Sequence, residues 1–299
     1  MNLRHLESFL AIVEEGSFTR AARRLGIAQP SLSQQIRSLE AELGGELIER
    51  LPRGIRLTAA GKNFLPEAQA ALRSVQRAGA AAKRALGLET GELEIATLLS
   101  MAVGILPGAI TRLLERHPDL TIRMHEYTHR ALLEENVRNG VGDVALGPVP
   151  LAWPGPVEPL GFEELVVVLP LGDPLAQREM VPLEALADRH WILFPPEHGL
   201  NDVVTSACRS AGFQPRVSVS TTQVEAAARL AAAGLGPAMV PGNAIAPGLP
   251  ARVVRVDPPI ARELAIYSRG EFSPIESAFV ETLKQGSWAA RPRGRALLV

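Results

Sequence analysis

The chain has 299 residues, of which 46% are hydrophobic and 21% charged, and a formal net charge of −1. This is the composition of a globular protein with room for two or more domains. Its single cysteine, Cys208, excludes an intramolecular disulfide. Acidic residues near the N-terminus argue against a signal peptide, and no apolar run reaches the roughly 18 residues that cross a bilayer. We therefore expect a cytoplasmic protein without a membrane partner.

Charge is distributed unevenly along the chain. Residues 1–88 contain 13 Lys and Arg against 8 Asp and Glu, a net of +5, whereas the remaining residues have a net of −6. A basic segment followed by an acidic body indicates a nucleic-acid partner at the N-terminal end. Uneven surface charge without such a partner explains this difference equally well.

The first 44 residues predict three short helices. Asn2 is suited to cap the first helix, and Gly16 to end it. Ser17 is suited to cap the second, and Gly26 lies where a helix end needs a residue that tolerates positive φ. Pro30 fits the first turn of a third helix, where its missing N–H costs nothing. Gly26 and Pro30 therefore mark a tight turn between two helices.

The third predicted helix has two different faces. Its apolar stripe consists of Leu32, Ile36, Leu39 and Leu43. The opposite face is predicted to present Ser31, Ser33, Gln34 and Arg37. A helix that enters the major groove needs hydrogen-bonding side chains and little negative charge near its N-terminus. The alternative is a small helical bundle with a polar outer face.

A hairpin and a long helix follow. Residues 47–50 and 55–57 predict two short strands, with Arg53 in the turn between them. Arg53 is placed to enter a minor groove and Arg56 to contact phosphate. Thr58 is suited to cap the long helix, whose small and apolar residues repeat as a heptad seam that requires a partner helix. The larger members of that seam, and the expected dimer contacts, are Leu65, Leu72, Val75 and Leu86.

The N-terminal segment resembles the LysR-type transcriptional regulators. The resemblance is carried by FLAIVEEGSFTRAARRLGIAQPSLSQQIRSLEAELGGELIER and by RGIRLTAAG. It implies an all-α winged helix-turn-helix domain with a long linker helix, and homodimers or homotetramers on promoter DNA. It also implies a small-molecule effector, with RNA polymerase as a further partner. The residues it places at the DNA are Gln29, Pro30, Ser31, Ser33, Gln34, Arg37 and, in the wing, Arg53.

From Gly91 onward, short apolar runs alternate with helical segments, which predicts an α/β sheet. The family resemblance implies two subdomains similar to periplasmic binding proteins. The expected domains are residues 1–58 for DNA binding, 59–88 for the linker helix and 89–299 for the effector. Within the effector domain, we expect one subdomain at about residues 91–162 with 268–299, and the other at residues 163–267.

In open α/β sheets, ligands bind beyond the carboxyl ends of strands, where helix N-termini converge. Helix N-termini favour an anion, although Asp202 opposes a simple carboxylate. The resemblance matches Ser100 to an effector-contacting serine, whereas His129 stands where a threonine is common. Each residue has a capping or loop role as its alternative. The expected effector contacts are Ser100, Met101, Thr128, His129, Gly147, Pro148, Asn201 and Asp202.

Other functions are weighed against a regulator. The chain lacks the Walker A, H-E-x-x-H and G-x-S-x-G motifs, so no enzyme activity, metal or cofactor is expected. A small-molecule-binding protein whose N-terminal helices serve only assembly is one alternative. A thiol-based redox regulator acting through Cys208 is another, although the pattern around this residue favours a buried, packed cysteine. The sequence leaves open the effector, the operator, and activation versus repression.

Overall fold

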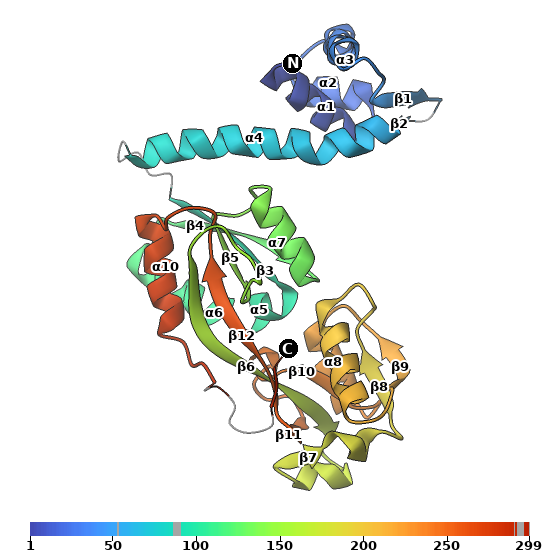
Figure 1. The fold of residues 1–299 in the computed structure, drawn as a ribbon, viewed down its shortest axis with the longest axis vertical. Coiled ribbons are helices and arrows are strands. Elements are labelled where there is room, and N and C mark those ends of the chain that lie inside the picture. Colours follow the sequence, from blue (N-terminus) through green and yellow to red (C-terminus); the bar gives the residue numbers. More distant parts are fainter. Residues whose placement is uncertain (53, 86–90, 290, 292–295, 299) are drawn as a thin grey trace. The chain divides into compact units, whose positions relative to one another are not determined.

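The computed structural model describes residues 1–52, 54–85, 91–289, 291 and 296–298. The chain divides into two compact units, Met1–Thr90 and Gly91–Val299, and each is considered by itself. Within the described residues no helix combines the length and the apolar character needed to cross a membrane. Figure 1 shows the elements of both units.

The N-terminal unit consists of three helices, a hairpin and a long helix, and its helix ends follow the predicted capping residues. Asn2 Oδ1 accepts a hydrogen bond from the His5 amide at 3.1 Å, and Gly16 ends the first helix with φ +60°. Gly26 has φ +67°, and the amide after it closes the second helix by bonding to the Ala22 carbonyl at 3.0 Å. The elements are α1 Leu3–Glu15, α2 Phe18–Arg24, α3 Gln29–Leu43, β1 Ile48–Leu51, β2 Gly54–Leu57 and α4 Ala59–Ala85.

The long helix α4 contributes to the core of this unit through the first half of the expected dimer seam. Thr58 Oγ1 accepts from the Gly61 amide at 3.0 Å, so Thr58 caps α4 as predicted. Ala68 is buried in the core, and Leu65 and Leu72 pack against it. The first half of the seam therefore covers the chain's own helices. Val75, which is 46% exposed, remains available to a partner, and Leu86 lies outside the described residues.

The second unit is built on a single mixed sheet in the order β4-β3-β5-β12-β6-β10-β8-β9, with β11, β7 and β13 paired at its sides. Its first strands and helices are β3 Glu92–Leu98, α5 Leu99–Gly104, α6 Leu106–Arg116, β4 Thr121–Tyr127, α7 Arg130–Arg138, β5 Val144–Pro148, β6 Val157–Pro170 and β7 Met180–Pro182. The rest are β8 His190–Leu193, α8 Gly199–Ser210, β9 Arg216–Ser220, α9 Val224–Ala232, β10 Ala238–Pro241, β11 Ala251–Asp257, β12 Ile260–Tyr267, α10 Pro274–Lys284 and β13 Leu297–Leu298. Short 3-10 turns connect some of these elements.

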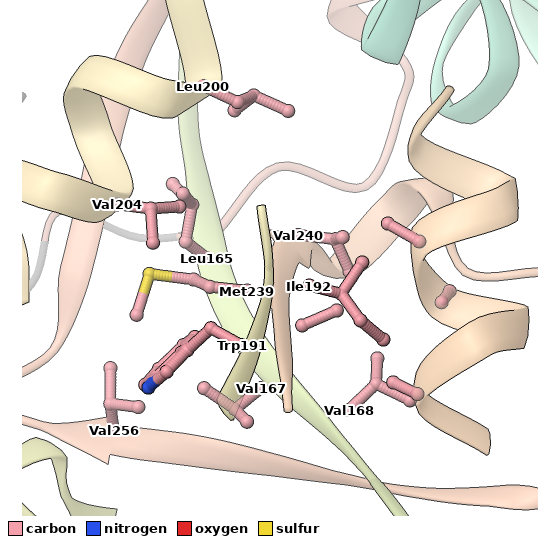
Figure 2. Close-up of a cluster of buried hydrophobic side chains, with 14 of the residues drawn as sticks. Leu165, Val167, Val168, Trp191, Ile192, Leu200, Val204, Met239, Val240 and Val256 are labelled. Atoms are coloured by element: carbon pink, nitrogen blue, oxygen red, sulfur yellow. The ribbon is translucent and has the colours of Figure 1, made fainter. Parts of the chain in front are cut away.

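Two long antiparallel strands, β6 and β12, cross from one half of this unit to the other (Figure 1). One core lies around β3, β5 and α10, and the other around β8, β10 and α8. Figure 2 shows Trp191, Met239 and Val204 among the side chains that fill the second core. On β12 the change of core falls between Ile260 and Leu264, earlier than the boundary at residue 268 that we expected.

The strand β6 begins at Val157, eight residues before its uninterrupted apolar run starts at Leu165. Gly161 and three glutamates, Glu158, Glu163 and Glu164, interrupt the apolar pattern before Leu165. These residues are tolerated because β12 pairs with this part of β6 along its whole length. One of the glutamates, Glu163, faces a cross-strand arginine.

Candidate DNA-binding and effector-binding sites

The helix α3 presents a polar face with no acidic residue in its first three turns. Gln29, Pro30, Ser31, Gln34 and Arg37 are exposed on it. Arg37 Nη2 donates to Gln34 Oε1 at 3.1 Å, so the two longest side chains of the face are held together. Such a face offers several hydrogen-bond donors and a cation to base edges and phosphates.

Ser33 departs from the expected arrangement, because it is buried with 6% of its surface exposed. It follows Leu32 on the helix and lies beside the buried Ile36 stripe. Its hydroxyl accepts a hydrogen bond from Gln29 Nε2 at 3.2 Å. The expectation of an exposed Ser33 is therefore wrong, and the residue instead orients Gln29.

Two contacts that the sequence did not suggest fix α3 against its neighbours. The carboxylate of Glu40 accepts from the backbone amides of Leu47 and Ile48, at 2.8 and 3.2 Å, which ties α3 to the start of the hairpin. Gln35 on α3 accepts from the hydroxyl of Ser8 on α1. The polar face is thus carried by a helix that is held at both sides.

In the hairpin formed by β1 and β2, one arginine is paired with a carboxylate. Arg56 pairs with Glu49, its cross-strand partner, with Nε 2.9 Å from Oε2. Its charge is therefore less available to phosphate than the sequence suggested. Arg50, which the sequence did not single out, lies with its guanidinium 4.1 Å from the centroid of the Phe18 ring. Arg53 lies outside the described residues.

In the second unit, the structure brings together residues from two distant segments at the N-terminus of α8. The Gly199 amide donates to the Thr128 carbonyl at 2.9 Å. His129 Nε2 lies 3.4 Å from Asp202 Oδ2. His129 Nδ1 also accepts from the Ala131 amide at 3.0 Å, so this histidine caps α7 as well. Asn201 lies in the first turn of the same helix α8.

Ser100 belongs to a buried polar chain that sequence reasoning missed. Its hydroxyl accepts from Arg262 Nη2 at 2.9 Å, and the Nε of Arg262 pairs with Glu163. The other oxygen of Glu163 accepts from Asn243 Nδ2 at 3.0 Å. The charged residues within two largely apolar strands, β6 and β12, were the available signal. Pairing of the two charges is what allows them to be buried.

His198 is a second residue that the sequence did not indicate, and it is 3% exposed. Its ring stacks on Phe194, with 4.7 Å between centroids, and Nδ1 accepts from the Leu200 amide at 3.1 Å. Burial lowers the pKa of the ring, and the positive charge of Arg262 lowers it further. Its Nε2 is buried and makes no well-formed hydrogen bond within the described residues, although the Thr222 backbone lies nearby. The position directly before the α8 helix was its only signal.

Three expected effector contacts are enclosed by the protein. Met101 is fully buried in the first core. Gly147 and Pro148 lie in β5, a buried strand, where they pair with Ala265 and Leu264. A Cβ at Gly147 would meet Leu133 at 2.8 Å, so this position serves close packing. Neighbouring strands and helices cover these three residues in this conformation, and effector contact by them stays a prediction.

The described residues contain no group of three His, Cys, Asp or Glu side chains that could hold a metal ion. Cys208 is fully buried in the second core, and burial raises the pKa of its thiol to about 12.

A winged helix-turn-helix unit, a long helix and an α/β unit with two cores define the class of DNA-binding transcriptional regulators that carry an effector domain. Residues 3–62 match the family model described as bacterial regulatory helix-turn-helix protein, lysR family, and residues 86–288 match the LysR substrate binding domain. The chain belongs to the LysR-type transcriptional regulator family. This confirms the resemblance, the fold class and the expectation that the chain is not an enzyme. It argues against N-terminal helices that serve assembly alone.

Related proteins and solved structures match this chain over most of its length. A probable hydrogen peroxide-inducible genes activator of Mycobacterium leprae is 34% identical over 241 residues, which are 80% of this chain and 77% of that protein. The transcriptional dual regulator GltC of Bacillus subtilis is 31% identical over 292 residues, 95% of this chain and 97% of GltC. The structure of full-length CbnR in complex with its target DNA matches with a TM-score of 0.72 and 26% identity, covering 95% of this chain and 99% of CbnR.

Proposed function

We propose that this regulator binds operator DNA through the exposed face of α3 and responds to a small anionic effector at the N-terminus of α8. For the DNA, the supporting observation is the cluster of Gln29, Ser31, Gln34 and Arg37 on one exposed face, with Arg37 as its cation. Pro30 lies in the first turn and contributes helix geometry to that face.

The DNA contact is tested with the double-stranded DNA upstream of the gene that encodes the chain. Arg37→Ala removes a guanidinium that can bond to guanine or phosphate, and is expected to weaken binding by about tenfold or more. Arg116→Ala, an exposed arginine on α6, is the charge-matched control and is expected to bind as the wild type does. Affinity should fall steeply with salt, because phosphate contacts release counterions. Wild-type affinity in a folded Arg37→Ala variant would overturn the assignment.

For the effector, the supporting observation is the positive potential around His198 at the start of α8. Because Nδ1 accepts from the Leu200 amide, the neutral ring carries its proton on Nε2. That N–H is buried, and the Thr222 backbone is the acceptor that lies near it. Arg262 and His129 act electrostatically on the same ring. The N-terminus of the 12-residue helix α8 adds further positive potential.

Thr128, His129, Asn201, Asp202 and Ser100 are proposed as the surroundings of this effector. Asp202 opposes an anion less than its charge suggests, because it is exposed and faces His129 at 3.4 Å. A thermal-shift series with small carboxylates on the full chain tests the proposal. A carboxylate that raises the melting temperature should lose its effect in His198→Ala and keep it in His190→Ala, which changes an exposed histidine. Equal shifts in both variants would exclude His198 as a contact.

A redox regulator is the second candidate, and the name of the Mycobacterium leprae relative favours it. The geometry of Cys208 favours the small-molecule effector instead. Its thiol is fully buried in an apolar core, and its pKa of about 12 suppresses the reactive thiolate. A redox role would require this core to open.

Assembly as a homodimer or homotetramer is proposed to use the second half of α4, where Val75 and Ala82 are exposed. An isolated exposed seam of small residues buries little area, so a charge in its centre should weaken it. Val75→Glu is expected to shift the chain toward the monomer in size-exclusion chromatography with light scattering. RNA polymerase remains a proposed further partner, to be tested by co-purification on promoter DNA.

A further inference from the structure

The second unit contains a cavity of about 440 Å³ that none of the expected effector contacts lines. The helix α6 and the first half of β6 border it, together with the turn at Asn243 and the segment after α10. Its apolar wall consists of Ile105, Ala109, Phe162, Val166, Leu283 and Trp288. The volume falls in the range of sites that enclose small organic ligands.

The wall formed by the segment after α10 is held in place. Trp288 Nε1 donates to the Leu283 carbonyl at 2.9 Å, so the polar atom of the indole is already used. Phe162 and Ala289 exchange two backbone hydrogen bonds, at 3.2 and 3.0 Å. Gly161 has φ +146°, and a Cβ there would lie 2.5 Å from the Trp288 Cβ. The Trp288 ring is therefore a fixed apolar surface of the cavity.

The charged groups that line the cavity are not equivalent. Glu163 is bound by Arg262 and Asn243, and Glu164 pairs with Arg255 at 2.7 Å. Both carboxylates are thus compensated by the protein itself.

Arg112 differs from them. Its Nη2 donates to the Thr282 carbonyl on α10 at 3.3 Å. Its Nε is buried and makes no hydrogen bond, and no carboxylate of the described residues forms an ion pair with it. The cavity therefore combines an uncompensated guanidinium with apolar and aromatic walls.

We propose that this cavity is a second ligand site, specific for a small carboxylate with an apolar or aromatic body. The carboxylate pairs with the part of the Arg112 guanidinium that lines the cavity, and the body packs against Trp288 and Phe162. A neutral ligand of the same shape gains only the apolar contacts. The site is distinct from the proposed effector site, yet Glu163 links the two, because it lines the cavity and holds the arginine that binds Ser100.

Isothermal titration calorimetry on the full chain tests the proposal, with phenylacetate as the probe and 2-phenylethanol as its neutral analogue. Arg112→Gln is expected to weaken phenylacetate about tenfold or more, because a charged hydrogen-bond pair is lost. It should leave the weaker 2-phenylethanol binding unchanged. Arg116→Gln removes an arginine one turn further along α6 that does not line the cavity, and should bind both compounds as the wild type does.

Two further results separate this site from the one at α8. His198→Ala should leave phenylacetate affinity unchanged if the compound binds at Arg112. Arg112→Lys should restore part of the lost affinity, because it keeps the charge without the planar fork. The proposal is overturned if wild-type chain does not bind phenylacetate. It is also overturned if affinity falls in His198→Ala and stays the same in Arg112→Gln.

Discussion

The polar face of α3 and the polar chain of the second unit place similar groups in opposite settings. On α3, the exposed groups fall between Gln29 and Arg37 on one helix, and solvent satisfies what the protein does not. In the second unit, Ser100, Glu163 and Arg262 come from three distant segments and are almost fully buried. An exposed site is organised by one helix, whereas a buried one depends on strand register and on complete pairing of its charges.

The buried pair should give the largest response to mutation. Arg262→Met leaves Glu163 with an uncompensated charge in the interior, and is expected to lower the free energy of unfolding by about 3–5 kcal/mol. Arg255→Met breaks the more exposed pair with Glu164 and should cost less than about 1 kcal/mol.

Tryptophan fluorescence during urea unfolding measures this difference, because Trp153, Trp191 and Trp288 all belong to the second unit. The double variant Glu163→Gln, Arg262→Met should recover part of the loss, since no buried charge then remains. Equal losses for Arg262→Met and Arg255→Met would show that burial does not distinguish the two pairs.

The features of the first unit that were predictable are local ones. Asn2, Gly16, Gly26 and Thr58 act within a few residues of their own position, so spacing along the chain is sufficient to identify them. Ser33 escaped this reasoning because it stands at the border of the buried stripe, where a small shift of the helix decides its exposure. Helical spacing shows that Leu65 and Leu72 lie on an apolar face, but it does not show that this face packs against the chain's own core.

The polar chain of the second unit could not be predicted, because it depends on which strands become neighbours. Arg262 and Glu163 are direct cross-strand partners, yet they lie 99 residues apart. The strand order and register that unite them arise from tertiary packing of both cores. Short apolar runs predicted an α/β sheet, since strands that are buried on both faces are continuously apolar, but no run specifies which strand it pairs with.

Two serines on α3 allow the same comparison between an exposed and a buried polar group, with smaller expected effects. Ser31→Ala removes an exposed hydroxyl and should weaken operator binding by about 1 kcal/mol without changing thermal stability. Ser33→Ala removes a buried acceptor from Gln29, and should lower the melting temperature measured by circular dichroism. The reverse assignment of these effects would place Ser33, and not Ser31, at the DNA.

The pH dependence of stability compares a buried titratable group, His198, with an exposed one. Its pKa is lowered in the folded state, chiefly by burial, so the unfolded chain takes up a proton more readily below its usual pKa of about 6.5. The stabilising contribution of the neutral ring is therefore complete above that pH and is lost as the pH falls. Protonation would also replace the Nδ1 acceptor that caps α8 with a donor.

His198→Asn keeps an acceptor for the Leu200 amide and removes the titration. The loss of unfolding free energy between pH 7.5 and 5.5, measured with urea, should therefore be smaller in this variant than in wild type. The exposed His190→Asn should behave as the wild type does. Identical pH slopes in wild type and His198→Asn would mean that the ring titrates alike in both states.

The smallest expected effect concerns Cys208, and it decides between the two candidate signals. With a pKa of about 12, only about one thiol in 10,000 is a thiolate at pH 8, and no sulfur surface is exposed to a reagent. An aromatic disulfide reagent should therefore leave the folded chain unlabelled and modify one thiol per chain in urea. Hydrogen peroxide should leave operator affinity unchanged in wild type and in Cys208→Ala. A peroxide response in wild type that disappears in Cys208→Ala would instead require the core around Trp191 and Val204 to open, and would make this cysteine the sensor.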